Sequence, residues 1–70
     1  MAAEIEIRVN GDVRCVPADL DVARLLAHLG IGTSRVGVER NQELVPRARF
    51  ADTRVLAGDR FEIVSFVGGG

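Results

Sequence analysis

Lysine, tryptophan and tyrosine are absent from this 70-residue sequence, and all nine basic residues are arginines. Without lysine, the chain offers no side-chain amine as an acceptor for acyl transfer. Three phenylalanines are the only aromatic residues, and they are not interleaved with a basic stripe, so stacking on nucleic-acid bases has little support. The net charge of −1 gives no overall attraction to nucleic acid or to a membrane surface. We therefore expect neither as a partner.

Cysteine and histidine occur once each. Because Cys15 cannot form an internal disulfide, we expect a reducing compartment, most simply the cytoplasm. A catalytic cysteine needs an activating partner, so we expect Cys15 to be a small buried hydrophobic side chain. His28 is expected at a solvated helix position, and no Cys/His/Asp cluster has the spacing of metal ligands. We therefore expect no bound metal. No glycine-rich run ends in Lys-Ser/Thr, so we also expect no ATP site and no other cofactor on this chain.

Long apolar runs are also missing, although 47% of the residues are hydrophobic. That fraction is typical of a globular domain, and the length suits one domain with a modest core. No run is long enough to span a membrane. The first residues, Met1 to Glu4, lack the basic region and apolar stretch of a secretory signal, which agrees with a cytoplasmic location.

The first half of the chain predicts a hairpin and one helix. Residues 4–9 alternate apolar and polar side chains, Asn10-Gly11 is a strong signal for a type I′ turn, and residues 12–16 form the returning strand. Asp21, or alternatively Asp19, is the expected N-cap of a helix of two to three turns. Gly30 is expected to end this helix in the left-handed C′ conformation. The apolar stripe of the helix comprises Val22, Leu25, Leu26 and Leu29.

The second half predicts two more strands and a short pairing. Residues 36–40 form the third strand, Leu44-Val45 pairs briefly, and Pro46 ends that pairing because proline has no N–H. An irregular segment around Phe50 follows. Its arginines are interpreted as a solvated surface, with a basic patch for an acidic partner or a nucleotide phosphate as the alternative: Arg47, Arg49 and Arg54.

Residues 60–67 form the last strand, and its two faces differ in an informative way. If Phe61 and Ile63 point into the core, then Val64 and Phe66 are apolar residues on the outer face. We interpret Val64 and Phe66 as a partner-docking surface, since exposed apolar patches often mark interaction sites. The alternative is that the helix or a loop covers them.

The order of these elements predicts an α+β protein of the β-grasp class, also called ubiquitin-like. A mixed sheet of four to five strands would pack on one main helix, with the first and last strands parallel at the sheet centre. We predict a β-grasp domain over residues 1–67 and a flexible glycine tail over residues 68–70. Gly68, Gly69 and Gly70 would form a thin, mobile end, because glycine has no side chain and orders at high entropic cost.

The carboxylate of Gly70 is the candidate reactive group, since the chain offers no catalytic cluster. The alternative is a disordered end or a cloning scar. From the residues alone, both interpretations stay open.

Several stretches together resemble the ThiS family, the ubiquitin-like sulfur carriers of thiamin (thiazole) biosynthesis. The resemblance covers nearly the whole chain through the order and spacing of motifs, none of them specific alone. The aromatic residue after the Val-Pro-Arg stretch is more often tryptophan in the family and is Phe50 here. The motifs are the Asn10-Gly11 hairpin, Asp21-Val22-x-x-Leu25-Leu26, Glu39-Arg40-Asn41, Val45-Pro46-Arg47, Gly58-Asp59-x-Phe61-Glu62-Ile63-Val64 and Phe66-Val67-Gly68-Gly69-Gly70.

The resemblance implies a carrier and not an enzyme. A ThiF-type adenylyltransferase would use ATP to adenylate the Gly70 carboxylate, and a cysteine-derived persulfide would supply the sulfur of a thiocarboxylate. Thiazole synthase would then receive that sulfur. Two alternatives remain: a sulfur carrier for molybdopterin or tRNA thiolation, and a ubiquitin-like protein modifier.

Overall fold

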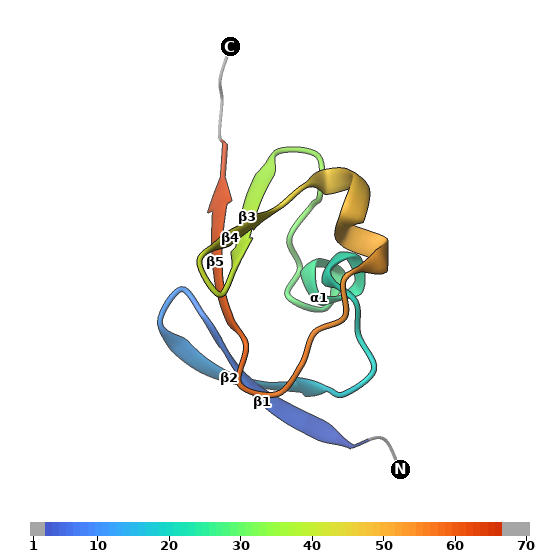
Figure 1. The fold of residues 1–70 in the computed structure, drawn as a ribbon, viewed down its shortest axis with the longest axis vertical. Helices are drawn as coiled ribbons and strands as arrows, with labels where there is room; N and C mark the ends of the chain where they lie inside the picture. Colours follow the sequence, from blue (N-terminus) through green and yellow to red (C-terminus); the bar gives the residue numbers. More distant parts are fainter. Residues whose placement is uncertain (1–2, 67–70) are drawn as a thin grey trace.

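The structure, a computed structural model, describes residues 3–66. The tail residues Gly68, Gly69 and Gly70 therefore lie outside the described residues, and the boundary between domain and tail stays a prediction. Five strands form one mixed sheet, and the helical segments lie on one side of it (Figure 1). No helix in residues 3–66 is long and apolar enough to cross a membrane.

The predicted hairpin is confirmed. Strands β1 (Glu4–Val9) and β2 (Asp12–Pro17) pair in antiparallel fashion across the Asn10-Gly11 turn. Asn10 has φ 52° and Gly11 has φ 88°, the positive values that a type I′ turn requires at both central residues. The two-residue turn fixes the register, so Ile5 lies opposite Val16 on the face that packs into the core.

The expectation that Cys15 is buried is wrong, because its side chain is exposed. The hairpin register places Cys15 opposite Glu6, on the outer face of the sheet. Its neighbour Val16 is the β2 residue that turns inward, with only 1% of its surface exposed. Adjacent strand residues point to opposite faces, so burying Val16 exposes Cys15.

Helix α1 (Val22–His28) begins and ends as predicted. The Asp21 carboxylate accepts a hydrogen bond from the Arg24 backbone N–H at 2.8 Å, which satisfies a donor in the first turn. Gly30 has φ 75°, and the Ile31 N–H donates to the Leu26 carbonyl at 2.8 Å, completing a Schellman motif. His28 is exposed in the last turn, as expected.

The segment around Phe50 is a 3₁₀ helix, η1 (Arg47–Asp52), and not the irregular stretch that the sequence suggested. It follows β3 (Val36–Arg40) and the short β4 (Glu43–Val45). The Arg49 N–H donates to the Pro46 carbonyl at 2.8 Å, so the chain tightens directly after the proline. This turn buries Phe50, whose ring is only 4% exposed, and that burial is the physical reason for the ordered segment.

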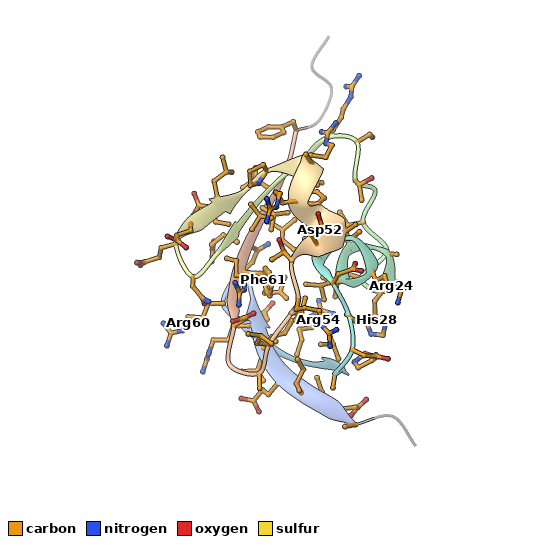
Figure 2. All side chains as sticks on the ribbon, turned by 45° about the vertical axis from the view of Figure 1, so that its right-hand side comes forward. Arg24, His28, Asp52, Arg54, Arg60 and Phe61 are labelled. Atoms are coloured by element: carbon orange, nitrogen blue, oxygen red, sulfur yellow. The ribbon has the colours of Figure 1, made fainter. Side chains whose placement is uncertain are left out.

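Strand β5 (Arg60–Ser65) lies at the centre of the sheet, whose order is β2-β1-β5-β3-β4. It runs parallel to β1 and antiparallel to β3, which confirms the predicted β-grasp arrangement. Figure 2 shows Phe61 pointing into the interior, whereas Arg60 of the same strand points away from it. The buried hydrophobic core comprises Ile7, Val9, Val16, Val22, Leu25, Leu26, Val36, Val38, Val45, Phe50, Val55, Phe61 and Ile63.

Candidate docking site

Two apolar residues that the sequence singled out are Val64, on the outer face of β5, and Phe66, which directly follows the end of the strand at Ser65. Val64 is 55% exposed and Phe66 is 62% exposed, whereas Phe61 and Ile63 are buried. The predicted assignment of the strand faces is therefore confirmed, and among residues 3–66 neither the helix nor a loop covers Val64 or Phe66. Their role in docking a partner stays a prediction.

Gly37 provides the surface on which the Phe66 ring lies. Gly37 pairs with Val64 across the β3–β5 ladder. A Cβ atom built on Gly37 would come within 3.3 Å of Cζ and 3.4 Å of Cε2 of Phe66. The Phe66 N–H also donates to the Arg35 carbonyl at 2.7 Å. The ring therefore rests on bare backbone, and any side chain at position 37 would crowd it.

A hollow of about 350 Å³ lies beside this ring on the outer face of the sheet. Leu44 of β4, which is 70% exposed, contributes a further apolar side chain. Leu44 was not among the site residues predicted from the sequence. Its signal was the alternation with buried Val45, which turns Leu44 outward. The lining residues are Gly37, Val38, Glu39, Leu44, Glu62, Val64 and Phe66.

Two carboxylates face each other along one side of this hollow. Glu39 of β3 lies opposite Glu62 of β5, and Leu44 of β4 lies opposite Glu39 on its other side. Both glutamates are exposed, and neither forms an ion pair with any residue that the structure describes. Like charges directly opposite each other destabilise a sheet. This pair was not predicted from the sequence, because it depends on the register of β3 against β5.

Asn10 fixes β5 from the side of the hairpin. Its amide Oδ1 accepts from the Ile63 N–H at 2.8 Å, and its Nδ2 donates to the Ile63 carbonyl at 3.1 Å. The Asn10 N–H donates to the Phe61 carbonyl at 2.8 Å. The side-chain amide thus continues the β1–β5 ladder past the end of β1. This makes β5 a firm support for the residues at its C-terminal end.

Asp59 organises the opposite end of β5. It is 5% exposed, and its Oδ2 accepts from Arg40 Nε and from the Leu56 N–H, both at 2.8 Å. Its Oδ1 accepts from Asn41 Nδ2 at 3.1 Å. Burial raises the pKa of Asp59, but the hydrogen bonds from Arg40, Leu56 and Asn41, together with the Arg40 charge, outweigh burial and lower it below 3.8. Asp59 therefore holds the loop before β5 against β3, and its role is structural.

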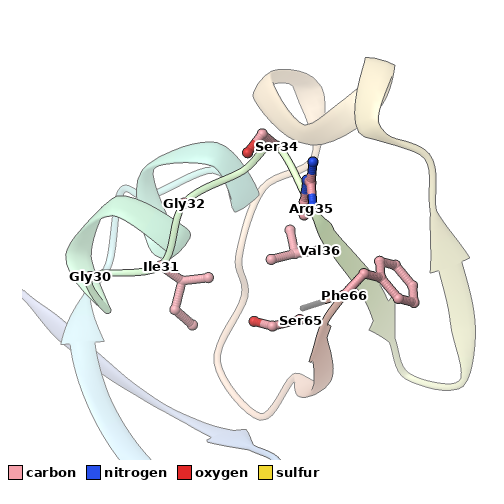
Figure 3. Close-up of a pocket in the computed structure, with 8 residues that line it drawn as sticks. All are labelled: Gly30, Ile31, Gly32, Ser34, Arg35, Val36, Ser65 and Phe66. Atoms are coloured by element: carbon pink, nitrogen blue, oxygen red, sulfur yellow. The ribbon is translucent and has the colours of Figure 1, made fainter. Parts of the chain in front are cut away.

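A second, larger hollow of about 480 Å³ lies between the loop after α1 and the end of β5. Figure 3 shows Ile31 of the loop and Ser65 of β5 facing the same space, with Phe66 at its edge. Arg35 is the charged residue in its lining. The Arg47 guanidinium donates to the Ser34 carbonyl at 2.6 Å and so ties η1 to this loop. Arg47, Arg49 and Arg54 are exposed, which agrees with a solvated surface.

Comparison with known proteins identifies the family. The model of the ThiS family matches residues 7–70. The chain belongs to the ThiS family. A crystal structure of the thiamine biosynthesis protein ThiS from Geobacter metallireducens superposes with a TM-score of 0.81 at 36% identity, over 94% of this chain and 100% of that one. This match supports the β-grasp fold assigned above.

Two further similarities extend the comparison. A thiazole synthase from Paramagnetospirillum magneticum is 42% identical over 66 residues, which is 94% of this chain. This ThiS-family chain spans about a fifth, 20%, of that relative's length. A designed protein based on human ubiquitin matches with a TM-score of 0.53 at 12% identity, over 100% of this chain and 98% of that one. That likeness concerns the fold alone.

Proposed function

We propose that this protein is a sulfur carrier for thiazole formation in thiamin biosynthesis and acts as a co-substrate of other enzymes. The observation that carries the proposal is the ThiS family match, which runs from residue 7 through the terminal glycines to residue 70. The similarity to a thiazole synthase favours the thiamin pathway over molybdopterin or tRNA thiolation.

The proposed chemistry takes place at the Gly70 carboxylate. A carboxylate is a poor electrophile, so a ThiF-type adenylyltransferase uses ATP to form the acyl-adenylate and releases pyrophosphate. The terminal sulfur of a cysteine-derived persulfide then attacks the carbonyl carbon and displaces AMP, giving an acyl disulfide. A thiol reduces the S–S bond of that intermediate, and the two electrons it supplies leave a thiocarboxylate on Gly70. Thiazole synthase accepts this sulfur.

The residues divide this work between body and tail. Val64 and Phe66 supply an exposed apolar surface for the partner, at the end of a strand held by Asn10. Gly68 and Gly69 place the carboxylate in the partner's active site, because glycines pass through a narrow channel without side-chain clashes. The partner supplies all the catalytic groups.

Intact-mass measurement tests the proposal. The protein is incubated with its adenylyltransferase, ATP and a persulfide sulfur source. We expect the mass to rise by the difference between one sulfur and one oxygen atom, with fragmentation placing the change at Gly70. A protein whose mass never changes, while conjugates to lysines of other proteins accumulate, would instead be a modifier.

A further inference from the structure

On the outer face of the sheet, two carboxylates without an ion-pair partner among residues 3–66 lie beside an apolar hollow. Glu39 and Glu62 lie opposite each other, and in such a cross-strand pair the Cβ atoms are about 5 Å apart. Both carboxylates border the hollow that contains Leu44, Val64 and Phe66. In the absence of a partner their repulsion is a cost to the sheet. A cation placed between them would remove that cost.

The arginines of this face do not supply that cation. Arg60 precedes Glu62 by two residues on β5 and so shares its face, but it lies next to Arg8 of β1. The two ion pairs found within residues 3–66 are Arg24–Asp21 and Arg40–Asp59. On this face the arginine pair Arg8 and Arg60 therefore lies between β1 and β5, and the carboxylate pair Glu39 and Glu62 lies between β3 and β5. A partner that covers this face therefore meets an arginine pair on one side of β5 and a carboxylate pair on the other.

Covalent geometry limits where the adenylating partner can sit. This step rests on the function proposed above. Gly70 follows Phe66 by four residues, and four extended residues reach at most about 14 Å. A partner that reacts with the Gly70 carboxylate must therefore place its active site within that distance of Phe66. Its surface then lies against the C-terminal end of β5, and the hollow that Phe66 lines extends from there to Glu39 and Glu62.

We propose that Glu39 and Glu62 bind an arginine or lysine side chain of the adenylyltransferase, next to an apolar side chain that fills the hollow formed by Leu44, Val64 and Phe66. The hollow accounts for an apolar contact, and the carboxylate pair requires a cationic one. Two carboxylates repel phosphate groups, so a nucleotide or an anionic lipid surface does not fit this face. The carboxylate pair sets the orientation of the partner, and the apolar contact supplies most of the affinity.

A double variant and a matched control test this inference. E39Q/E62Q removes the charges but keeps the side-chain shape. E4Q/E6Q makes the same change in net charge at two exposed glutamates of β1, away from the hollow. Association and dissociation rates with the adenylyltransferase are measured at low and high salt. We expect E39Q/E62Q to weaken binding roughly tenfold, mainly through slower association, and to reduce the salt dependence, whereas E4Q/E6Q binds like the wild type.

Further readouts separate the outcomes. The thermal midpoint of E39Q/E62Q should equal or exceed that of the wild type, because like-charge repulsion is removed. Equal binding and equal salt dependence for the two double variants would overturn the inference. Sedimentation showing a dimer of the free protein that E39Q/E62Q disrupts would assign the face to a second copy and would also overturn it. Wild-type protein that binds the adenylyltransferase but never gains sulfur would instead contradict the proposed function.

Discussion

At the scale of single residues, Asp59 shows how one buried charge is stabilised by its surroundings. Arg40, Asn41 and the Leu56 N–H all donate to its carboxylate, and their combined effect holds the pKa of Asp59 below 3.8. A carboxyl group whose pKa is lowered on folding stabilises the native state above its ordinary pKa, and this stabilisation is lost as the pH falls through the lowered value.

We therefore predict that acidification destabilises the wild type partly through Asp59. In Asp59→Asn, the new amide group places two donors among existing donors, so the free energy of unfolding near neutral pH should fall by about 1–3 kcal/mol. Urea denaturation of both proteins near neutral pH and at about pH 3 measures this effect. The difference between them should shrink at the lower pH. A difference that is independent of pH would show that the Asp59 charge contributes nothing.

Gly37 offers a second prediction at this scale. In Gly37→Ala the new Cβ would contact the Phe66 ring at 3.3 Å, and the exposed ring can move away. Stability should therefore change by no more than about 0.5 kcal/mol. Partner affinity should fall by roughly threefold to tenfold, because the apolar surface is rearranged.

Gly32→Ala is the matched control for this substitution, since a Cβ at Gly32 would meet nothing within 4 Å. Thermal midpoints and dissociation constants for the adenylyltransferase, measured for both variants, check the prediction. Equal affinities for Gly37→Ala and Gly32→Ala would mean that the position of the Phe66 ring does not matter for docking.

At the scale of elements, side chains of β5 alternate between the core and the outer face, so the residues that stabilise the fold differ from those that we expect to contact a partner. Val64→Asp changes an exposed side chain, so we predict that the free energy of unfolding falls by no more than about 1 kcal/mol. Affinity for the adenylyltransferase should fall at least roughly tenfold, because a charge replaces an apolar contact beside two carboxylates.

Val13→Asp is the control, because Val13 is 51% exposed on β2, against 55% for Val64. Calorimetry of binding and thermal unfolding of both variants provide the measurements. Equal losses of affinity in the two variants would argue for a nonspecific effect of charge. A large loss of stability with unchanged affinity in Val64→Asp would contradict the docking role of β5.

The same scale explains which sequence predictions failed. The Asn10-Gly11 turn fixes the pairing of Ile5 with Val16, and this alone places Cys15 on the outer face. Cysteine is often buried, but here the register of the hairpin decides which face its side chain occupies. The 3₁₀ helix η1 was missed because it has no periodic pattern, and its order depends on burying Phe50 against elements distant in the sequence.

At the scale of the whole molecule, the body supports the residues that follow β5. The buried core extends from Ile7 to Ile63. We predict that Gly69→Val leaves the thermal midpoint unchanged, since position 69 follows the last core residue. The β-branched side chain should reduce the yield of thiocarboxylate to background, because it would clash with the walls of a narrow channel.

Intact-mass analysis of Gly69→Val with the adenylyltransferase checks this prediction, and Gly69→Ala is the milder control. An undiminished yield from Gly69→Val would mean that the partner's channel accepts side chains. Deletion of Gly70 should likewise abolish charging, and sulfur found on the shortened chain would contradict the assigned position.

The sequence by itself determined the order of strands and helix, the hairpin turn, both ends of α1 and the two faces of β5. These features depend on neighbouring residues, through turn chemistry, capping and alternation. Only the tertiary structure decided that Asn10 binds Ile63, that Phe66 lies on Gly37 and that Glu39 faces Glu62. Those pairs join distant parts of the chain, and Asn10 and Ile63 are separated by 53 positions. Pairings of this kind follow from strand register across the whole sheet, which no local pattern encodes.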